Sequence, residues 1–231
     1  GLVLFYWLPG SYSAAPTAIS ALFAALLTKV GIYAIIRMFT LVFYHETSIT
    51  HLIIGIMAAI TMILGAFGAV ASNQIRSIIV YNVVIAVGFI LSGMAAFNIT
   101  AMTGSIYYLI HDIIVKMLIF LLAGTVILIA GTDKLKEISG LIRSHPFLGW
   151  MFFVGALSLS GIPPLSGFLG KVFITKGLLE AEMYWIGAIG LATSLLVLYS
   201  MMKIFMNAFW GETNLSPEEE KGSTKGLLLP L

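Results

Sequence analysis

The sequence predicts an all-α protein, a polytopic bundle of membrane-spanning helices in which some helices are discontinuous. Hydrophobic residues make up 60% of its 231 residues and charged residues only 10%, far from the composition of a soluble domain. The apolar residues gather in stretches of about 20 residues or more, the length that a helix needs to cross a bilayer. Paired prolines interrupt one of these stretches and must break its helix.

The chain opens with a short apolar segment, 1–9, which is too short to span a bilayer. We expect it to be the end of a broken helix, closed by Trp7 at the membrane interface and by Pro9, and we expect a loop at 9–16. The sequence starts inside one apolar run and stops in what reads as another. We therefore expect 1–231 to be a fragment that forms a single transmembrane domain.

Six predicted spans follow, separated by short polar or charged links. The fifth is broken at 161–166, where the motif SGIPPLSG places Pro163 and Pro164 in the path of the helix. Broken backbone at membrane depth is tolerated only inside protein or beside water. A polar loop, 209–226, follows the last span. The spans are 17–43, 49–71, 77–97, 101–130, 147–180 and 183–208.

The charges of the links predict the orientation in the membrane. The links after the second, fourth and sixth spans carry most of the basic residues, and the opposite side carries few. Cytoplasmic loops of membrane proteins have an excess of Lys and Arg. We therefore expect a multi-pass protein of the cell membrane with these cytoplasmic loops: 9–16, 72–76, 131–146 and 209–226.

The span 101–130 carries three ionisable residues near its middle, His111, Asp112 and Lys116. Each such group costs roughly 2.5–3.5 kcal/mol at the centre of a membrane helix, so it normally faces other helices or water. Asp112 and Lys116 are four residues apart and share a helix face, so they can pair. From this span alone, an internal ion pair that only helps helices to pack remains an alternative.

Two further lysines, Lys29 and Lys171, lie near mid-depth of other spans. Three unrelieved lysines would cost on the order of 8–10 kcal/mol, yet Asp112 is the single acid predicted inside the spans. The sequence therefore predicts a hydrated path that connects the lysines. Burial disfavours the charged form of lysine, which lets such a group accept and release protons. Lys171 also follows the broken helix, a feature that marks ion sites in transporters, and we expect water and carbonyl groups to stabilise its charged form.

The sequence excludes several other kinds of site. There is no Cys, so no disulfide, thiolate metal site or iron–sulfur cluster is expected. Of the four His, His111 alone lies deep in a span, which argues against a bis-histidine haem. We see no catalytic nucleophile, metal cluster or phosphate-binding loop, and the net charge of +2 says little about partners. We expect no enzymatic activity of its own, no cofactor, no metal and no nucleic-acid partner.

Three stretches of the sequence resemble one known family. They are FYWLPGSYSAAPTAISALFAALLTKVGIY, HDIIVKMLIFLLAG and SGIPPLSGFLGKVF. Together they look like the antiporter-like membrane subunits of Mrp-type Na+/H+ antiporters and respiratory complex I, and they are most similar to the D subunits of the Mrp antiporters. The resemblance covers essentially the whole chain and implies part of an inverted-repeat antiporter-like fold.

The resemblance also implies roles for individual residues and partners. Lys29 and Lys116 match connecting lysines of the family's proton relay, Lys171 matches its terminal lysine, and His111 and Asp112 fall in its polar stretch. The implied partners are the lipid bilayer, other subunits of a hetero-oligomeric antiporter complex, and protons with Na+ or another monovalent cation.

Two other functions remain open from the sequence. The first is a proton-pumping membrane subunit of an NADH:quinone oxidoreductase-type complex, and the second is a membrane scaffold that transports nothing. We also expect Arg37 and Lys203, near span ends, to reach lipid headgroups, and Asn82 to hydrogen-bond a neighbouring helix.

Overall fold

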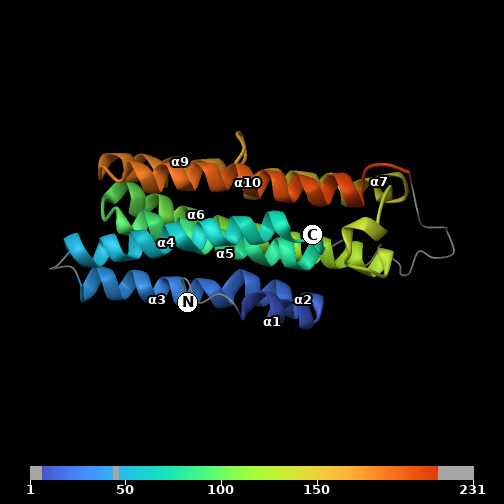
Figure 1. Cartoon of the computed structure of the whole chain (residues 1–231), viewed down its shortest axis with the longest axis horizontal. Helices are drawn as coiled ribbons and strands as arrows, with labels where there is room; N and C mark the ends of the chain where they lie inside the picture. The colour runs from blue at the N-terminus through green and yellow to red at the C-terminus, as the bar shows by residue number, and fades with distance from the viewer. Residues whose placement is uncertain (1–6, 44–46, 213–231) are drawn as a thin grey trace.

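The computed structural model describes residues 7–43 and 47–212, and nearly all of that part of the chain is helical (Figure 1). The predicted all-α class is therefore confirmed. Among the described residues, the β-type pairing is limited to an isolated bridge between Gln74 and Lys134. Most of the expected helix end at 1–9, and most of the loop 209–226, lie outside the described residues.

Five helical stretches are long and apolar enough to cross a membrane. The first is continuous through α2 (Thr17–Leu22), a π-helical turn η1 (Phe23–Leu27) and α3 (Thr28–Leu41). The other four are α4 (Thr47–Ala71), α5 (Ile75–Ala95), α6 (Ile99–Ala130) and α10 (Tyr184–Ala208). Two shorter helices, α8 (Pro146–Ser160) and α9 (Ser166–Glu180), flank the double-proline interruption. The remaining short elements are α1 (Leu8–Ala14), η2 (Leu135–Glu137) and α7 (Leu141–Ser144).

The segment 9–16, expected to be a loop, instead contains the helix α1. Proline is well accepted in a first helical turn, where no backbone N–H is needed, and Pro9 occupies that position. The helix stops at Ala14 because Ala15, which precedes Pro16, is extended, with φ −78° and ψ 152°.

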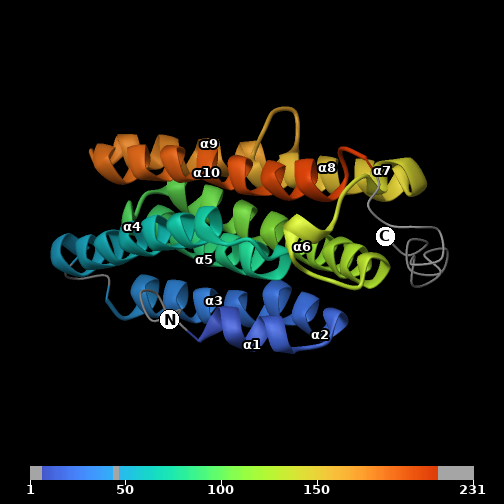
Figure 2. The same ribbon diagram turned by 45° about the vertical axis from the view of Figure 1, so that its right-hand side comes forward.

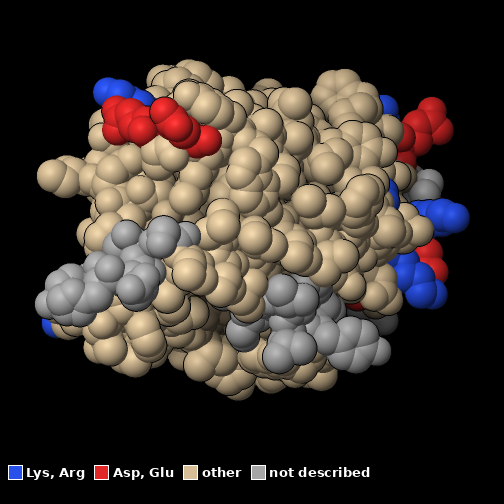
Figure 3. Space-filling model, turned by 60° about the vertical axis from the view of Figure 1, so that its left-hand side comes forward, with Lys and Arg blue, Asp and Glu red and all other residues tan. Residues whose placement is uncertain are grey.

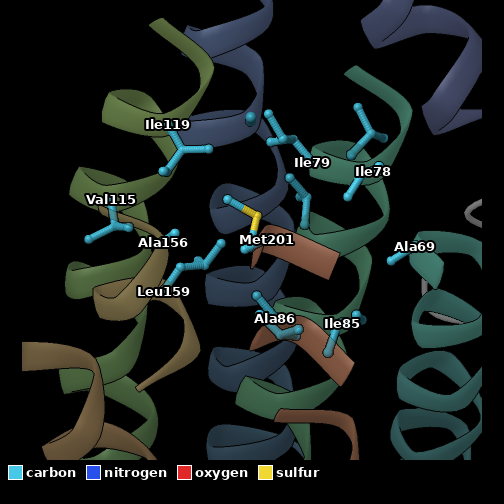
Figure 4. Close-up of a cluster of buried hydrophobic side chains, with 14 of the residues drawn as sticks. Ala69, Ile78, Ile79, Ile85, Ala86, Val115, Ile119, Ala156, Leu159 and Met201 are labelled. Atoms are coloured by element: carbon cyan, nitrogen blue, oxygen red, sulfur yellow. The ribbon is translucent and has the colours of Figure 1, made fainter. Parts of the chain in front are cut away.

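The helices lie in three tiers, which Figures 1 and 2 show from two directions. Helices α1 to α3 form one outer tier, α4 to α6 the middle tier, and α8 to α10 the other outer tier. Helix α5 lies at the centre and is buried along most of its length. Figure 4 shows part of the apolar core around it. The core there includes Ala69, Ile78, Ile79, Ile85, Ala86, Val115, Ile119, Ala156, Leu159 and Met201.

A glycine lets α6 and α9 approach closely. A Cβ at Gly104 would lie 2.6 Å from the backbone nitrogen of Ile174 on α9, a distance that real Cβ atoms do not reach. Small residues serve this purpose between membrane helices, where backbones pack against one another. The close approach brings together the helix that carries His111, Asp112 and Lys116 and the helix that carries Lys171.

Four links meet at one end of the bundle through hydrogen bonds to backbone carbonyls. Ile75 N donates to Asp133 O (2.9 Å), and Ile142 N donates to Phe209 O (3.1 Å). The side chain of Arg76 donates through Nη1 to the carbonyl of Ala15 (3.3 Å). The links 9–16, 72–76 and 131–146 and the start of 209–226 therefore share one end. On the face drawn in Figure 3, acidic and basic side chains gather at the two ends and leave an uncharged band between them.

The expectation that Lys203 reaches lipid headgroups is wrong. Its Nζ donates to the carbonyls of Val70 (3.1 Å) and Ser72 (2.7 Å) and to Asn73 Oδ1 (3.0 Å). The last carbonyls of a helix have no partner within the helix, and a lysine side chain can supply one. Lys203 of α10 thus caps the C-terminus of α4, which sequence spacing alone could not indicate.

Candidate functional site

The acid at the middle of α6 pairs most closely with a lysine from another helix. Lys29 Nζ lies 2.6 Å from Asp112 Oδ2, and the two side chains are 3% and 0% exposed. Lys29 Nζ also donates to the carbonyl of Ala24, at 2.7 Å. Ala24 belongs to the π-helical turn η1, and such turns occur frequently at functional sites. The π turn and Asp112 together hold the charged end of Lys29 against α6.

Lys116 shares the same carboxylate at a longer distance. Its Nζ lies 4.0 Å from Asp112 Oδ1, and its side chain is fully buried. Among the described residues, Lys116 Nζ has no hydrogen-bond partner. Two lysines and one carboxylate leave a formal excess of one positive charge in a site that is almost fully buried. Uncompensated buried charge is costly.

Lys171 on α9 occupies the space that the broken helix opens. Its Nζ donates to the carbonyl of Ser160, the last residue of α8, at 2.8 Å. In a continuous helix that carbonyl would accept from the N–H of residue 164, which is a proline and has none. The double proline therefore leaves the Ser160 carbonyl without a backbone donor, and Lys171 donates a hydrogen bond to it. The expectation that carbonyl groups stabilise this lysine is met by Ser160.

Two aromatic rings and a serine complete the surroundings of Lys171. Its Nζ lies 5.7 Å from the ring centre of Phe89 and 5.9 Å from that of Tyr108, within the range of cation–π attraction. It also donates to Ser194 Oγ on α10, at 3.0 Å.

His111 joins α6 to the first turn of α9. Its Nδ1 lies 2.8 Å from Ser166 Oγ, and 5% of the residue is exposed. A cavity of about 290 Å³ lies beside it and contains His111 and Ser166 in its lining. His111 therefore lies between the Asp112 site and the break that precedes Lys171.

The five residues expected from the sequence, Lys29, His111, Asp112, Lys116 and Lys171, are all buried and lie on three neighbouring helical stretches. We call them the buried ionisable cluster. The sequence did not indicate Ser160, Ser166 or Ser194 as partners of the cluster. A serine in an apolar span is a weak signal, because which neighbour it faces depends on how the helices pack.

A groove runs between α9 and α10 beside Lys171. Its volume is about 570 Å³, and its lining includes Lys171, Thr175, Leu179 and Ser194. Because Thr175 and Leu179 follow Lys171 along α9, the groove leads towards the C-terminal end of that helix. That end lies opposite the four joined links. We call this feature the α9–α10 groove.

Comparisons with known proteins agree with this architecture. A family model described as NADH:quinone oxidoreductase/Mrp antiporter, TM, matches residues 2–197. The D subunit of the Na(+)/H(+) antiporter of Bacillus subtilis is 51% identical over 227 residues, covering 98% of this chain and 46% of the relative. The D subunit of the Na(+)/H(+) antiporter of Alkalihalophilus pseudofirmus is 48% identical over 228 residues, covering 99% of this chain and 46% of the relative. The chain thus spans about half the length of these curated relatives.

Solved structures match at the level of the fold. A chain in the structure of the Mrp complex from Dietzia sp. DQ12-45-1b has a TM-score of 0.88 and 34% identity, over 94% of this chain and 42% of that one. A chain of respiratory complex I from Thermus thermophilus has a TM-score of 0.87 and 24% identity, over 97% of this chain and 48% of that one. The family expected from the three sequence stretches is confirmed. This multi-pass membrane protein belongs to the NADH:quinone oxidoreductase/Mrp antiporter transmembrane family.

Proposed function

We propose that this chain is part of the proton-conducting subunit of a multisubunit antiporter that exchanges protons for Na+ or another monovalent cation. The observation that carries the proposal is the buried ionisable cluster, which holds three buried lysines and a single buried carboxylate. Buried ionisable groups in membrane helices are expensive and mark proton relays and ion pathways. A cluster with excess positive charge has a physical reason to release and take up protons.

The proposed relay assigns different tasks to the three lysines. Asp112 lies closest to Lys29 and holds positive charge there. Lys116, whose nitrogen has no hydrogen-bond partner among the described residues, is the carrier that most easily changes its protonation state. Lys171 receives protons at the broken helix, and His111 with Ser166 links the two regions. Because like charges repel, a proton arriving at one lysine of the cluster favours release from another.

The partners and the location are part of the proposal. The curated relatives are named as D subunits of Na(+)/H(+) antiporters, and one structural match lies within an Mrp complex. We infer that the chain works in a hetero-oligomeric antiporter complex in the lipid bilayer of the cell membrane. The basic links support a cytoplasmic location for the end of the bundle where the four links meet.

Sequence identity favours this function over a proton pump of the NADH:quinone oxidoreductase type. The relatives named as antiporter subunits are 51% and 48% identical, whereas the complex I match is 24% identical and supports the fold alone. The scaffold alternative makes a different prediction, because a scaffold does not need lysines that change their charge.

The proposal is tested in everted membrane vesicles that carry the assembled complex, with a fluorescent pH dye and added Na+. Lys116→Ala should abolish the dye response, and Lys134→Ala should not. Lys134 is a suitable control because its side chain is 62% exposed and pairs with Glu137 in the link after α6. A normal response in Lys116→Ala, with normal assembly, would favour the scaffold.

A further inference from the structure

Lys171 contacts a hydroxyl group on α10, outside the buried ionisable cluster. Its Nζ donates to Ser194 Oγ at 3.0 Å, and Ser194 Oγ in turn donates to the carbonyl of Gly190 at 2.9 Å. The ammonium, the hydroxyl and the carbonyl thus form a chain of hydrogen bonds. This chain attaches the lysine of α9 to the backbone of the neighbouring helix.

The two hydrogen-bond acceptors of Lys171 differ in what they can do when the lysine loses a proton. The carbonyl of Ser160 can only accept a hydrogen bond, whereas a serine hydroxyl both accepts and donates. With charged Lys171, Ser194 accepts from Nζ. With neutral Lys171, the Ser194 hydrogen can turn away from Gly190 and point at the lone pair on Nζ. Ser194 can therefore hold Lys171 in place in both of its protonation states.

Ser194 also lies where a proton could leave the protein interior. It is half-buried, and together with Lys171 it lines the α9–α10 groove. Lys171 itself is buried, with 8% of its surface exposed. The Ser194 hydroxyl is thus placed between a buried lysine and the α9–α10 groove, whose volume is about 570 Å³.

We propose that Ser194 is the proton-transfer partner of Lys171 and passes its proton to water in the α9–α10 groove. In this step an Nζ–H bond of Lys171 breaks as an O–H bond forms at Ser194. The original O–H bond of Ser194 breaks, and its proton goes to a groove water. Lysine is left neutral, serine is left unchanged, and one proton has moved. The inference rests on the proposed function, because it requires that Lys171 carries protons.

A matched set of variants on α10 tests this step. Ser194→Thr and Ser194→Val add side chains of nearly equal shape, but only Thr keeps the hydroxyl. Thr193→Val is the control, because Thr193 Oγ1 also donates to Gly190 O (3.0 Å) but lies 3.9 Å from the Met62 sulfur rather than beside the lysine. Each variant is measured in the assembled complex in everted vesicles, with Na+-dependent proton exchange normalised to the amount of complex.

We expect Ser194→Thr and Thr193→Val to keep exchange within about two-fold of the unmodified protein, and Ser194→Val to lose at least about ten-fold. If Ser194→Val does not assemble, Ser194→Ala removes the hydroxyl without added volume and should show the same loss. Normal exchange in the variant without the hydroxyl would overturn the inference. Equal loss in Thr and Val, or loss in Thr193→Val, would also overturn it, because packing would then explain the effect.

Lys171→Arg in the same assay separates the two proposals. If Lys171→Arg exchanges normally, the proposed function of Lys171 fails. If Lys171→Arg is inactive while Ser194→Val is normal, the function of Lys171 stands and only the role of Ser194 fails.

Discussion

Asp112 of α6 lies 2.6 Å from Lys29 of α3 but 4.0 Å from Lys116 on its own helix. Spacing in the sequence pointed to Lys116, which is four residues away and on the same face. Lys29 approaches the carboxylate from a neighbouring helix and binds Oδ2, whereas Lys116 lies nearest to Oδ1. The close ion pair therefore connects two helices, and Lys116 remains the less constrained lysine.

Removing one partner of the Asp112–Lys29 pair should destabilise the protein. We expect Asp112→Asn to cost about 3–5 kcal/mol of stability, because it leaves Lys29 and Lys116 buried without a counter-charge. The triple variant Lys29→Met/Asp112→Leu/Lys116→Met removes all three charges, so it should recover much of this stability and still fail to exchange protons. Thermal unfolding in detergent measures the first effect, and the vesicle assay the second. Recovery of exchange in the triple variant would show that the three groups only neutralise one another.

The orientation of the bundle can be tested with single cysteines, because the chain contains no Cys. Lys136 is exposed in the link between α6 and α7, and Glu180 is exposed at the opposite end of the molecule. A membrane-impermeant thiol reagent should label Lys136→Cys in everted vesicles and Glu180→Cys in intact cells. Labelling of both positions from the same side of the membrane would contradict the arrangement described above.

Lys203 should contribute to stability rather than to transport. It donates to the carbonyls of Val70 and Ser72 at the end of α4, and hydrogen bonds to a charged group contribute about 1.5–3 kcal/mol. We expect Lys203→Ala to lower the unfolding temperature in detergent while exchange per assembled complex stays near normal. Lys176→Ala is the matched control and should change stability by no more than about 1 kcal/mol, because its partner lies at an exposed surface. Equal stability of the two variants would argue against the cap.

The sequence predicted the fold class and the buried lysines because both depend on hydropathy. Apolar stretches define the long helices, and charged residues inside them stand out. Asn82 also follows the prediction that it bonds a neighbouring helix, since its Nδ2 donates to Ser200 Oγ on α10 at 3.0 Å. Each of these predictions needs only the sequence of one span and the position of a residue along that span.

The sequence could not predict which side chains meet between helices. The expectation for Lys203 was wrong because a position near the end of a span looks the same whether lipid or a neighbouring helix terminus lies beside it. The Lys29–Asp112 pair and the Lys171–Ser194 contact depend on how α3, α9 and α10 pack against the rest. A carbonyl partner for Lys171 was predicted, since the prolines remove hydrogen-bond donors beside it, but the sequence did not show that the carbonyl would be that of Ser160.

Lys171→Arg in the assembled complex shows whether Lys171 releases and takes up protons. Arginine keeps the positive charge and the donors that reach Ser160 and Ser194, but it does not release its proton in a protein. The measurement is the response of a fluorescent pH dye when Na+ is added to everted vesicles, with complex assembly measured in parallel. We predict normal assembly and loss of the dye response. Near-normal exchange with normal assembly would show that Lys171 supplies only a fixed positive charge and does not carry protons.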